Sequence, residues 1–245
     1  MPKCPQCGRI STPHYLRIGK KWDRIGYWCV SCHKPVDLIA RPDPLIYKMD
    51  IRDFLSTHNK RYQVIYADPP WRYDVDSVPK NRLIENHYAT MPLEDIAALP
   101  VLKIAKDPAI LFLWTTSPKT EEGLAVMKSW GFTYRTQIVW EKYSNGKLQI
   151  GLGNNVRGSH ELLLIGKRGE FFTPKYKPPS TITARRNEHS VKPDKFYEIV
   201  ENMYPTASRI ELFARRPRPG WASVGNQIEA AKSVPAAIQA WGVSE

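Results

Sequence analysis

Short apolar runs that alternate with longer segments limit most strongly how this chain can fold. The runs have the length and composition of buried strands, and the alternation predicts an α/β sandwich with a mostly parallel sheet. The strand candidates are residues 62–67, 109–114, 133–140, 161–165 and 209–213. Ligands bind such sheets at the carboxyl ends of the strands, so the residues that follow each run are the first candidates for a functional site.

Two of the intervening segments have helical periodicity. Residues 120–130 form the first, and Gly131 follows as a C-terminal stop. The second begins at Pro193, a residue that is favoured in the first turn of a helix. The predicted inward positions are Leu124, Met127 and Trp130 in the first helix, and Phe196, Ile199, Val200 and Met203 in the second.

All 4 cysteines of the chain lie in its first 32 residues, as two Cys-x-x-Cys pairs separated by 21 residues. Four thiolates at this spacing predict a tetrahedral structural zinc site, with the intervening segment forming a small hairpin. The predicted ligands are Cys4, Cys7, Cys29 and Cys32. Two alternatives stay open: the thiols are simply reduced, or His14 or His33 replaces one of them.

The cysteine pairs define a small N-terminal module, and Pro42 to Pro44 resembles a linker after it. We therefore divide the chain into a zinc-ribbon-like module, residues 1–45, and a larger domain, residues 46–245. Basic and aromatic residues alternate between the cysteine pairs, as in surfaces that contact nucleic acid, although the aromatics could also pack around the metal. The net charge of +12 and the pI near 9.5 favour a polyanionic partner, with simple solubility as the alternative.

The sequence Asp68-Pro69-Pro70-Trp71 directly follows the strand predicted at 62–67. Prolines have nearly fixed φ angles and no N–H group, so this loop is expected to be stiff, with carbonyls free to point into a pocket. An exocyclic adenine amine is a weak nucleophile because its lone pair is delocalised. Acceptors on its two N–H bonds, the Asp68 carboxylate and the Pro69 carbonyl, would localise that pair, and Trp71 would stack on an extruded base.

This loop resembles the signature of the DPPW-type adenine N6-methyltransferases, which include the catalytic subunit of the eukaryotic messenger-RNA methyltransferase. The similarity covers about residues 46–228. It includes the segments 88–91, 112–114, 138–140, 190–194 and 210–213, and it ends with Trp221 and residues 225–227. The resemblance implies a Rossmann-like fold with permuted motif order, S-adenosylmethionine as the methyl donor, and no glycine-rich GxGxxG loop.

The resemblance also implies which residues hold the cofactor. Asp50 and the backbone of Ile51 would contact its adenine, while Asp68 and Lys192 would face the amine and the carboxylate of its methionine part. The ribose and the loop around it would be organised by Glu211, Arg215, Asn226 and Gln227. The segment 216–219 departs from the His-Asn type that is usual in the family, which puts its cofactor contacts in doubt.

For the target base, the resemblance implies a pocket lined by Tyr88, Trp140, Lys142 and Glu161. Core packing or a surface ion pair is the alternative for each of them. A basic loop, residues 178–189, would hold phosphates through Arg185, Arg186 and His189, although a solvated loop would have the same composition.

The sequence leaves several functions open. A cytosine N4-methyltransferase faces the same chemical problem, but it more often has a Ser-Pro-Pro-Tyr-like loop. A non-catalytic nucleic-acid-binding subunit would be expected to lack Asp68, and a zinc-module regulator would leave the pocket motifs unexplained. DNA is favoured over RNA by analogy with compact bacterial and phage enzymes, and homodimers or paired subunits are common in the family.

We expect an intracellular protein of a bacterium or a phage-infected cell. No apolar run of the sequence is long enough for a membrane span, and the first residues lack the apolar region of a secretory signal.

Overall fold

The computed structural model of this chain describes most of the larger domain and part of the N-terminal module. The described residues are 7, 9, 45–73, 90–144, 146–151, 155–170, 173–185, 191–226 and 228, together with the backbone of three strands within residues 12–38. The predicted ligands Cys4 and Cys32, and the predicted site residues Tyr88, Arg186, His189 and Gln227, lie outside this set.

The three N-terminal strands form an antiparallel sheet of their own, in the order β1-β2-β3. They are β1 (Thr12–Ile18), β2 (Lys21–Cys29) and β3 (Lys34–Leu38). The hairpin of β1 and β2 lies between the two cysteine pairs in the sequence, where we predicted one. Among the described residues, no group of three or more His, Cys, Asp or Glu side chains could hold a metal ion, and the zinc site stays a prediction.

The larger domain is built on a nine-stranded mixed sheet in the order β10-β7-β9-β6-β5-β11-β12-β4, with β8 paired to β7. Its strands are β4 (Leu45–Tyr47), β5 (Tyr62–Ala67), β6 (Ala105–Thr115), β7 (Thr133–Ser144), β8 (Lys147–Leu148), β9 (His160–Arg168), β10 (Thr181–Arg185), β11 (Arg209–Leu212) and β12 (Ala222–Val224). The block β6-β5-β11-β12-β4 is parallel throughout, as is the pair β10 and β7. Strand β9 runs against both of its neighbours, β6 and β7.

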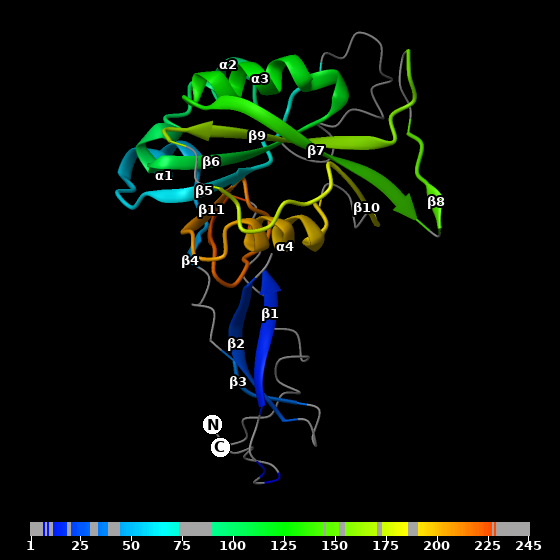
Figure 1. Cartoon of the computed structure of the whole chain (residues 1–245). Coiled ribbons are helices and arrows are strands. Elements are labelled where there is room, and N and C mark those ends of the chain that lie inside the picture. Colours follow the sequence, from blue (N-terminus) through cyan, green and yellow to red (C-terminus); the bar gives the residue numbers. More distant parts are fainter. Residues whose placement is uncertain are drawn as a thin grey trace.

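Helices cover both faces of this sheet (Figure 1). Helices α1 (Ile51–Thr57), α2 (Leu93–Ala97) and α3 (Thr120–Ser129) contribute buried side chains to one core, together with the short helix η3 (Val101–Ile104). Helix α4 (Asp194–Met203) packs on the opposite face and forms a second core with the outward-facing residues of β5, β6, β7 and β9. The α/β sandwich predicted from the alternating runs is therefore present.

The end of α3 shows both a confirmed and a wrong prediction. Gly131 has a φ of 75°, and the N–H groups of Gly131 and Phe132 donate to the carbonyls of Lys128 and Met127 at 2.9 and 3.0 Å. This is the left-handed helix stop that the glycine predicted. Leu124, in contrast, is 38% exposed, because the inward face of α3 is formed by its neighbours Gly123, Val126 and Met127.

None of the described helices is long and apolar enough to cross a bilayer. The longest, α3 and α4, have 10 residues each.

Candidate active site

The sheet brings the predicted functional segments to one edge. Strands β5, β11, β12 and β4 are parallel neighbours, and Ala67 pairs with Leu212, which in turn pairs with Val224. The residues that follow these strands in the chain, which include Asp68 and Phe213, therefore emerge side by side. The reversed strand β9 begins at the same edge, since Leu162 pairs with Thr115 at the end of β6. Thus Glu161 joins the site from the amino end of its strand.

The Asp68-Pro-Pro-Trp71 loop is held by its own backbone. The Pro69 carbonyl accepts the N–H of Trp71 at 2.9 Å, and the Pro70 carbonyl accepts the N–H of Met91 at 2.8 Å. We predicted that these carbonyls would be free to bind a ligand. This prediction is wrong, because each carbonyl already accepts one backbone hydrogen bond. A carbonyl oxygen has a second lone pair, so the Pro69 carbonyl can still accept a bond from a ligand.

Trp71 does not have the exposed ring that stacking on a base requires. Its side chain is only 7% exposed and belongs to the core beneath α1 and α2. The indole N–H donates to the carbonyl of Trp114 at 3.0 Å, which fixes the ring against β6. The ring packs among the apolar residues of the core at this end of β5. Trp71 therefore anchors the loop and does not form a platform for the base.

A chain of alternating charges runs from Asp68 along this edge of the sheet to β9 and β7. Lys192 lies 3.0 Å from the Asp68 carboxylate and 2.9 Å from Glu161, and Lys142 lies 2.6 Å from the other oxygen of Glu161. All four side chains are largely buried. The Lys192 ammonium also lies over the ring of Trp114, 5.1 Å from its centroid. Each buried charge therefore has a partner of opposite sign, as burial requires.

These neighbours set the ionisation of the carboxylates. Burial raises the pKa of Asp68, and the attraction of Lys192 offsets this effect only in part. Burial acts in the same direction on Glu161, but Lys192 and Lys142 together outweigh it and lower its pKa to about 2. Burial alone would lower the pKa of Lys192, whereas its two carboxylate partners raise it. Asp68 is consequently the better proton acceptor of the two carboxylates.

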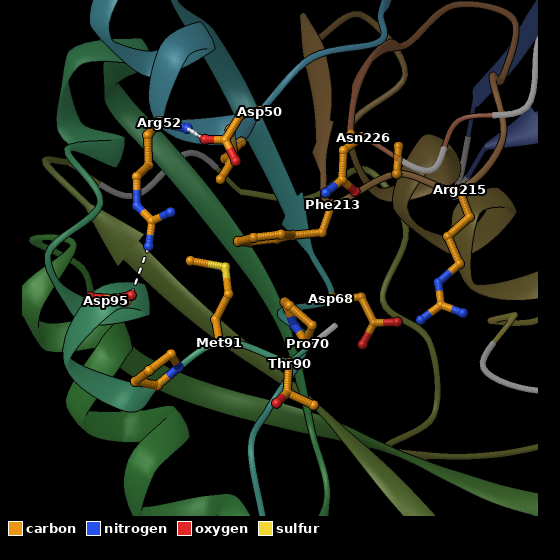
Figure 2. Close-up of a pocket in the computed structure, with 14 residues that line it drawn as sticks. Asp50, Arg52, Asp68, Pro70, Thr90, Met91, Asp95, Phe213, Arg215 and Asn226 are labelled. Atoms are coloured by element: carbon orange, nitrogen blue, oxygen red, sulfur yellow. Dashed lines mark hydrogen bonds and ion pairs between the residues drawn. The ribbon is translucent and has the colours of Figure 1, made fainter. Parts of the chain in front are cut away.

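A cavity of about 340 Å³ opens beside Asp68 at this edge (Figure 2). The Phe213 ring extends into it between Asp50 and Met91, and Arg215 lies on the side of Asp68 (Figure 2). The lining residues are Asp50, Ile51, Arg52, Asp68, Pro70, Thr90, Met91, Pro92, Asp95, Phe213, Ala214, Arg215, Gly225 and Asn226. The volume lies within the usual range of small-molecule sites, and the lining combines an aromatic ring with charges of both signs.

The backbone around this cavity is adapted to a close approach. Phe213 has a φ of 62°, a conformation that a bulky residue rarely adopts. A Cβ atom on Gly225 would lie 2.2 Å from the carbonyl oxygen of Ala214, so a side chain cannot be accommodated there without moving the two strand ends apart. The wall of the cavity therefore depends on a glycine and on one strained residue.

A buried carboxylate lies on the α4 face next to this wall. Oε1 of Glu211 accepts the hydroxyl of Tyr197 at 2.7 Å, while Oε2 has no hydrogen-bond partner among the described residues. Ser223 lies opposite Glu211 in the register of β11 and β12, and its hydroxyl also has no hydrogen-bond partner among the described residues. Burial raises the pKa of Glu211 to about 7. Glu211 is thus a polar group with unused bonding capacity close to the cavity lining.

The fold and this edge can be compared with known proteins. The sequence profile of the family described as MT-A70 matches residues 62–227, which is more than half of the chain. The chain belongs to the MT-A70 family.

Named relatives of this MT-A70 chain include the Type II methyltransferase M.MunI of Mycoplasma sp, with 32% identity over 71% of this chain and 81% of that protein. A probable N(6)-adenosine-methyltransferase MT-A70-like of Oryza sativa subsp. japonica is 31% identical over 78% of this chain and 26% of its own length. The N(6)-adenosine-methyltransferase catalytic subunit METTL3 of Homo sapiens is 28% identical over 69% of this chain and 28% of its length. The chain therefore spans most of the Mycoplasma relative but less than a third of the plant and human ones. The predicted family and the predicted methyltransferase class are confirmed.

The structure gathers most of the predicted cofactor residues of this MT-A70 domain around the cavity. Its lining includes the predicted residues Asp50, Ile51, Asp68, Arg215 and Asn226. Lys192 adjoins the cavity through Asp68, and Glu211 lies on the α4 face of the sheet. Their contacts with a cofactor stay predictions.

Of the residues predicted to contact the target base, some lie near Asp68 and others do not. Lys142 and Glu161 lie in the charge chain that leads to Asp68. Trp140 is only 3% exposed, and its indole N–H donates to the carbonyl of Ala184 at 3.0 Å. Its buried ring cannot line an open pocket, so the core-packing alternative holds for Trp140. Arg185 is exposed at the end of β10 on the same edge of the sheet.

Other cavity residues were not predicted. They are Arg52, Pro70 as a lining residue, Thr90, Met91, Pro92, Asp95, Phe213, Ala214 and Gly225. Phe213 ends the strand predicted at 209–213, so the strand-end rule could have selected it, whereas the strand before Gly225 was not predicted. The ion pair of Arg52 and Asp95, with 2.7 Å between the charged atoms, joins α1 to α2 at the cavity (Figure 2). The two residues are 43 positions apart, so no local sequence pattern could have predicted the pair.

Proposed function

We propose that this chain transfers the methyl group of S-adenosylmethionine to the N6 amine of adenine in DNA. The observation that carries the proposal is a largely buried carboxylate, Asp68, that lies on the wall of the cavity and is paired with Lys192. The family membership and the names of the relatives support the reaction.

The cavity fits the proposed cofactor. A zwitterionic methionine part needs one partner of each sign, and Asp68 and Lys192 supply them within one ion pair. Two of the three N–H bonds of the Lys192 ammonium are used by Asp68 and Glu161, which leaves one for a ligand carboxylate. At the other end of the cavity, Asp50 and Ile51 would hold the adenine. Asn226, Arg215, Glu211 and the undescribed Gln227 would hold the ribose.

The reaction then needs little from the protein beyond orientation and proton acceptance. When bound, S-adenosylmethionine supplies an electrophilic methyl group on a positively charged sulfur. The Asp68 carboxylate and the second lone pair of the Pro69 carbonyl would accept the two N–H bonds of the target amine and direct its lone pair at that methyl group. The methylated nitrogen must lose one proton. Asp68, with its pKa raised by burial, is the acceptor that we propose.

The choice of DNA rests on the comparison with the relatives. The chain is similar in extent to the Type II methyltransferase of Mycoplasma, of which it spans 81%, whereas it corresponds to 26% of the rice adenosine methyltransferase. The net charge of +12 suits either polymer. We place the activity in the cytoplasm of a bacterium or of a phage-infected cell.

We infer in addition that Cys4, Cys7, Cys29 and Cys32 hold a structural zinc ion. The spacing of the two pairs and the antiparallel hairpin between them support this inference. The metal would stabilise a segment that is too short to form its own core, and the module would contribute to nucleic-acid binding.

The decisive experiment is a methyl-transfer assay with isotopically labelled S-adenosylmethionine. Duplex DNA, single-stranded DNA and RNA are offered separately, and the products are digested to nucleosides for mass spectrometry. Labelled N6-methyladenine from DNA is expected. The same product from RNA alone would change the polymer, and labelled N4-methylcytosine would change the base. An absence of label, with cofactor binding intact, would indicate a missing partner subunit or a non-catalytic protein and would contradict the proposal.

The same assay tests Asp68. Asp68→Ala should lower kcat about 100-fold or more, the usual effect of removing one preorganised polar group at a reacting centre. Asp68→Asn keeps one acceptor oxygen but neither the charge nor the basicity, so it should lose nearly as much. Binding of S-adenosylmethionine, measured by calorimetry, should weaken much less in both variants. Turnover near that of the wild type in either one would remove Asp68 from the mechanism.

A further inference from the structure

The connection between β11 and β12 is unusually short for two parallel strands. It consists of residues 213–221, which form neither a helix nor a strand. A parallel crossover normally needs a dozen or more residues, most often with a helix that packs the connection onto the sheet. This connection also supplies Phe213, Ala214 and Arg215 to the cavity wall. Something other than a helix must therefore fix its position.

Arg218 provides that fixation through helix α4. Its Nε and Nη2 atoms lie 2.8 and 3.2 Å from the two carboxylate oxygens of Glu201, which is a bidentate pair. Its Nη1 atom lies 3.1 Å from Asp194. Glu201 is only 7% exposed, and the pKa of Arg218 is raised because these carboxylates outweigh the effect of burial. Such a pair imposes one geometry on the connection.

Neighbouring residues attach the same connection to the same face of α4. Arg216 lies 2.6 Å from Asp194, and the indole N–H of Trp221 donates to Glu201 at 2.8 Å. The guanidinium of Arg218 also lies 5.0 Å from the centroid of the Tyr197 ring. Asp194, Tyr197 and Glu201 are three and then four residues apart, so they form one stripe along the helix.

The helix that receives these contacts also begins at the active site. Asp194 is the first residue of α4 and is two residues beyond Lys192, which pairs with Asp68. The contacts of Arg218 thus connect two walls of the site: the segment with Lys192 and the segment with Phe213, Ala214 and Arg215.

We propose that Arg218 is a positioning residue for the cofactor: it clamps residues 213–215 to α4 and so keeps the cavity wall in its binding geometry. The identity of the ligand rests on the proposed function. The segment 216–219 is where the sequence departs from the usual family pattern, and these contacts give that departure a role. Arg218 acts through the wall residues and not by touching the reacting atoms.

The test compares affinity for S-adenosylmethionine with thermal stability. Arg218→Met should raise the Kd about tenfold, as expected if the wall keeps its competent geometry only about a tenth of the time. The KM for the cofactor should rise in parallel, while kcat at saturating cofactor changes much less. Arg218→Lys keeps the charge but not the bidentate geometry, so it should give a smaller increase.

The double variant Arg218→Met with Glu201→Gln separates positioning from folding. It leaves no unpaired buried carboxylate, so its Tm should recover toward that of the wild type while its Kd stays high. Recovery of the Kd together with the Tm would overturn the proposal, as would an unchanged Kd in Arg218→Met. If Arg218→Met does not fold, the double variant decides alone.

Arg168→Met is the matched control, since Arg168 pairs with Asp107 at the opposite edge of the sheet. Its Kd should equal that of the wild type. A wild-type chain that binds no S-adenosylmethionine would contradict the proposed function itself. A wild-type chain that binds normally, with unchanged binding in the Arg218 variants, would contradict only the clamp.

Discussion

Three carboxylates at the active-site edge differ in proton affinity because their neighbours differ. Glu161 lies between two lysines, and its pKa is lowered to about 2. Asp68 has one lysine and also feels the charge of Glu161, so burial prevails and its pKa is raised. Burial raises the pKa of Glu211 to about 7, and the hydrogen bond from Tyr197 and the attraction of Arg216 and Arg218 offset this effect only in part. One edge of the sheet thus contains a permanent anion, a base and a group that titrates near neutrality.

Glu211 makes the stability of the protein depend on pH. Its pKa is higher in the folded protein, about 7, than the ordinary value of 4.5. The stabilisation from its bound proton is therefore complete below pH 4.5 and is lost as the pH rises through about 7. We expect the free energy of unfolding of the wild type to fall, relative to Glu211→Gln, across this interval. Urea denaturation at several pH values measures the difference.

Glu161→Gln is the control for that measurement, because the pKa of Glu161 is shifted in the opposite direction from that of Glu211 and its effect on stability has the opposite pH dependence. The pKa of Glu161 is lowered to about 2, so its stabilisation is present above pH 4.5 and is lost as the pH falls toward 2. A constant difference between the wild type and Glu211→Gln from pH 4.5 to 7 would show that Glu211 is ionised normally.

The sequence predicted residues at strand ends better than aromatic side chains. Asp50, Asp68 and Asn226 line the cavity, and they were selected by a resemblance whose motifs follow strands. Trp71 and Trp140 were assigned to base contact, yet both rings are buried. An aromatic residue at a strand end can turn toward the core or toward solvent, and the choice depends on the neighbouring strands, which local sequence does not specify.

At the level of elements, the long buried strands and the short buried strand β11 were predictable, whereas β4 and β12 were not. Strand β5 has the predicted bounds, and β6, β7 and β9 extend beyond theirs. Strands β4 and β12 have 3 residues each, too few to show a period, and β4 is half-exposed at the sheet edge. The pairing of β12 between β11 and β4 is a tertiary property. It completes the cavity, so the wall at Gly225 could not be placed from local sequence.

At Phe213, the first residue of the β11–β12 connection, the positive φ should make glycine more stabilising than alanine, the reverse of their usual order in helices and strands. Phe213→Gly and Phe213→Ala both remove the ring, but only glycine tolerates a φ of 62° without strain. We expect the glycine variant to be more stable than the alanine variant by about 1 kcal/mol, the size of the left-handed penalty for residues with a Cβ. Chemical denaturation measures this, and both variants should bind the cofactor more weakly.

Ala125→Gly on the exposed side of α3 is the matched control. Here alanine is the better residue, and the glycine should cost about 1 kcal/mol. If alanine were also the more stable choice at position 213, the backbone there would not be constrained to a positive φ.

For the whole molecule, we propose that the positive charge and the N-terminal module hold the nucleic acid. The net charge of +12 makes binding depend on counterion release, so the logarithm of affinity should fall linearly with the logarithm of salt concentration. The zinc-ribbon-like module, residues 1–45, is basic and separate in the sequence from the cavity residues. It is therefore the first candidate for phosphate contacts that do not involve the target base.

Cys4→Ser combined with Cys29→Ser should release zinc and weaken binding to DNA. The salt slope should become shallower by about 0.9 for each phosphate contact that is lost. Metal analysis and fluorescence anisotropy at several salt concentrations measure the two effects. Affinity for S-adenosylmethionine should be unchanged, which would show that the larger domain is intact. Loss of zinc without any change in DNA affinity or salt slope would mean that the module does not contact the nucleic acid.

The order of the segments along the chain has a consequence for synthesis on the ribosome. Asp50 and Asp68 are translated early, whereas Phe213, Gly225 and Asn226, which line the same cavity, are translated more than 140 residues later. A nascent chain that ends before β11 contains the complete Asp68-Pro-Pro-Trp71 loop but lacks the cavity wall beside it. If this cavity binds the methyl donor, as we propose, the donor has no complete site until Asn226 has been translated, so growing chains are not expected to methylate nucleic acid before then.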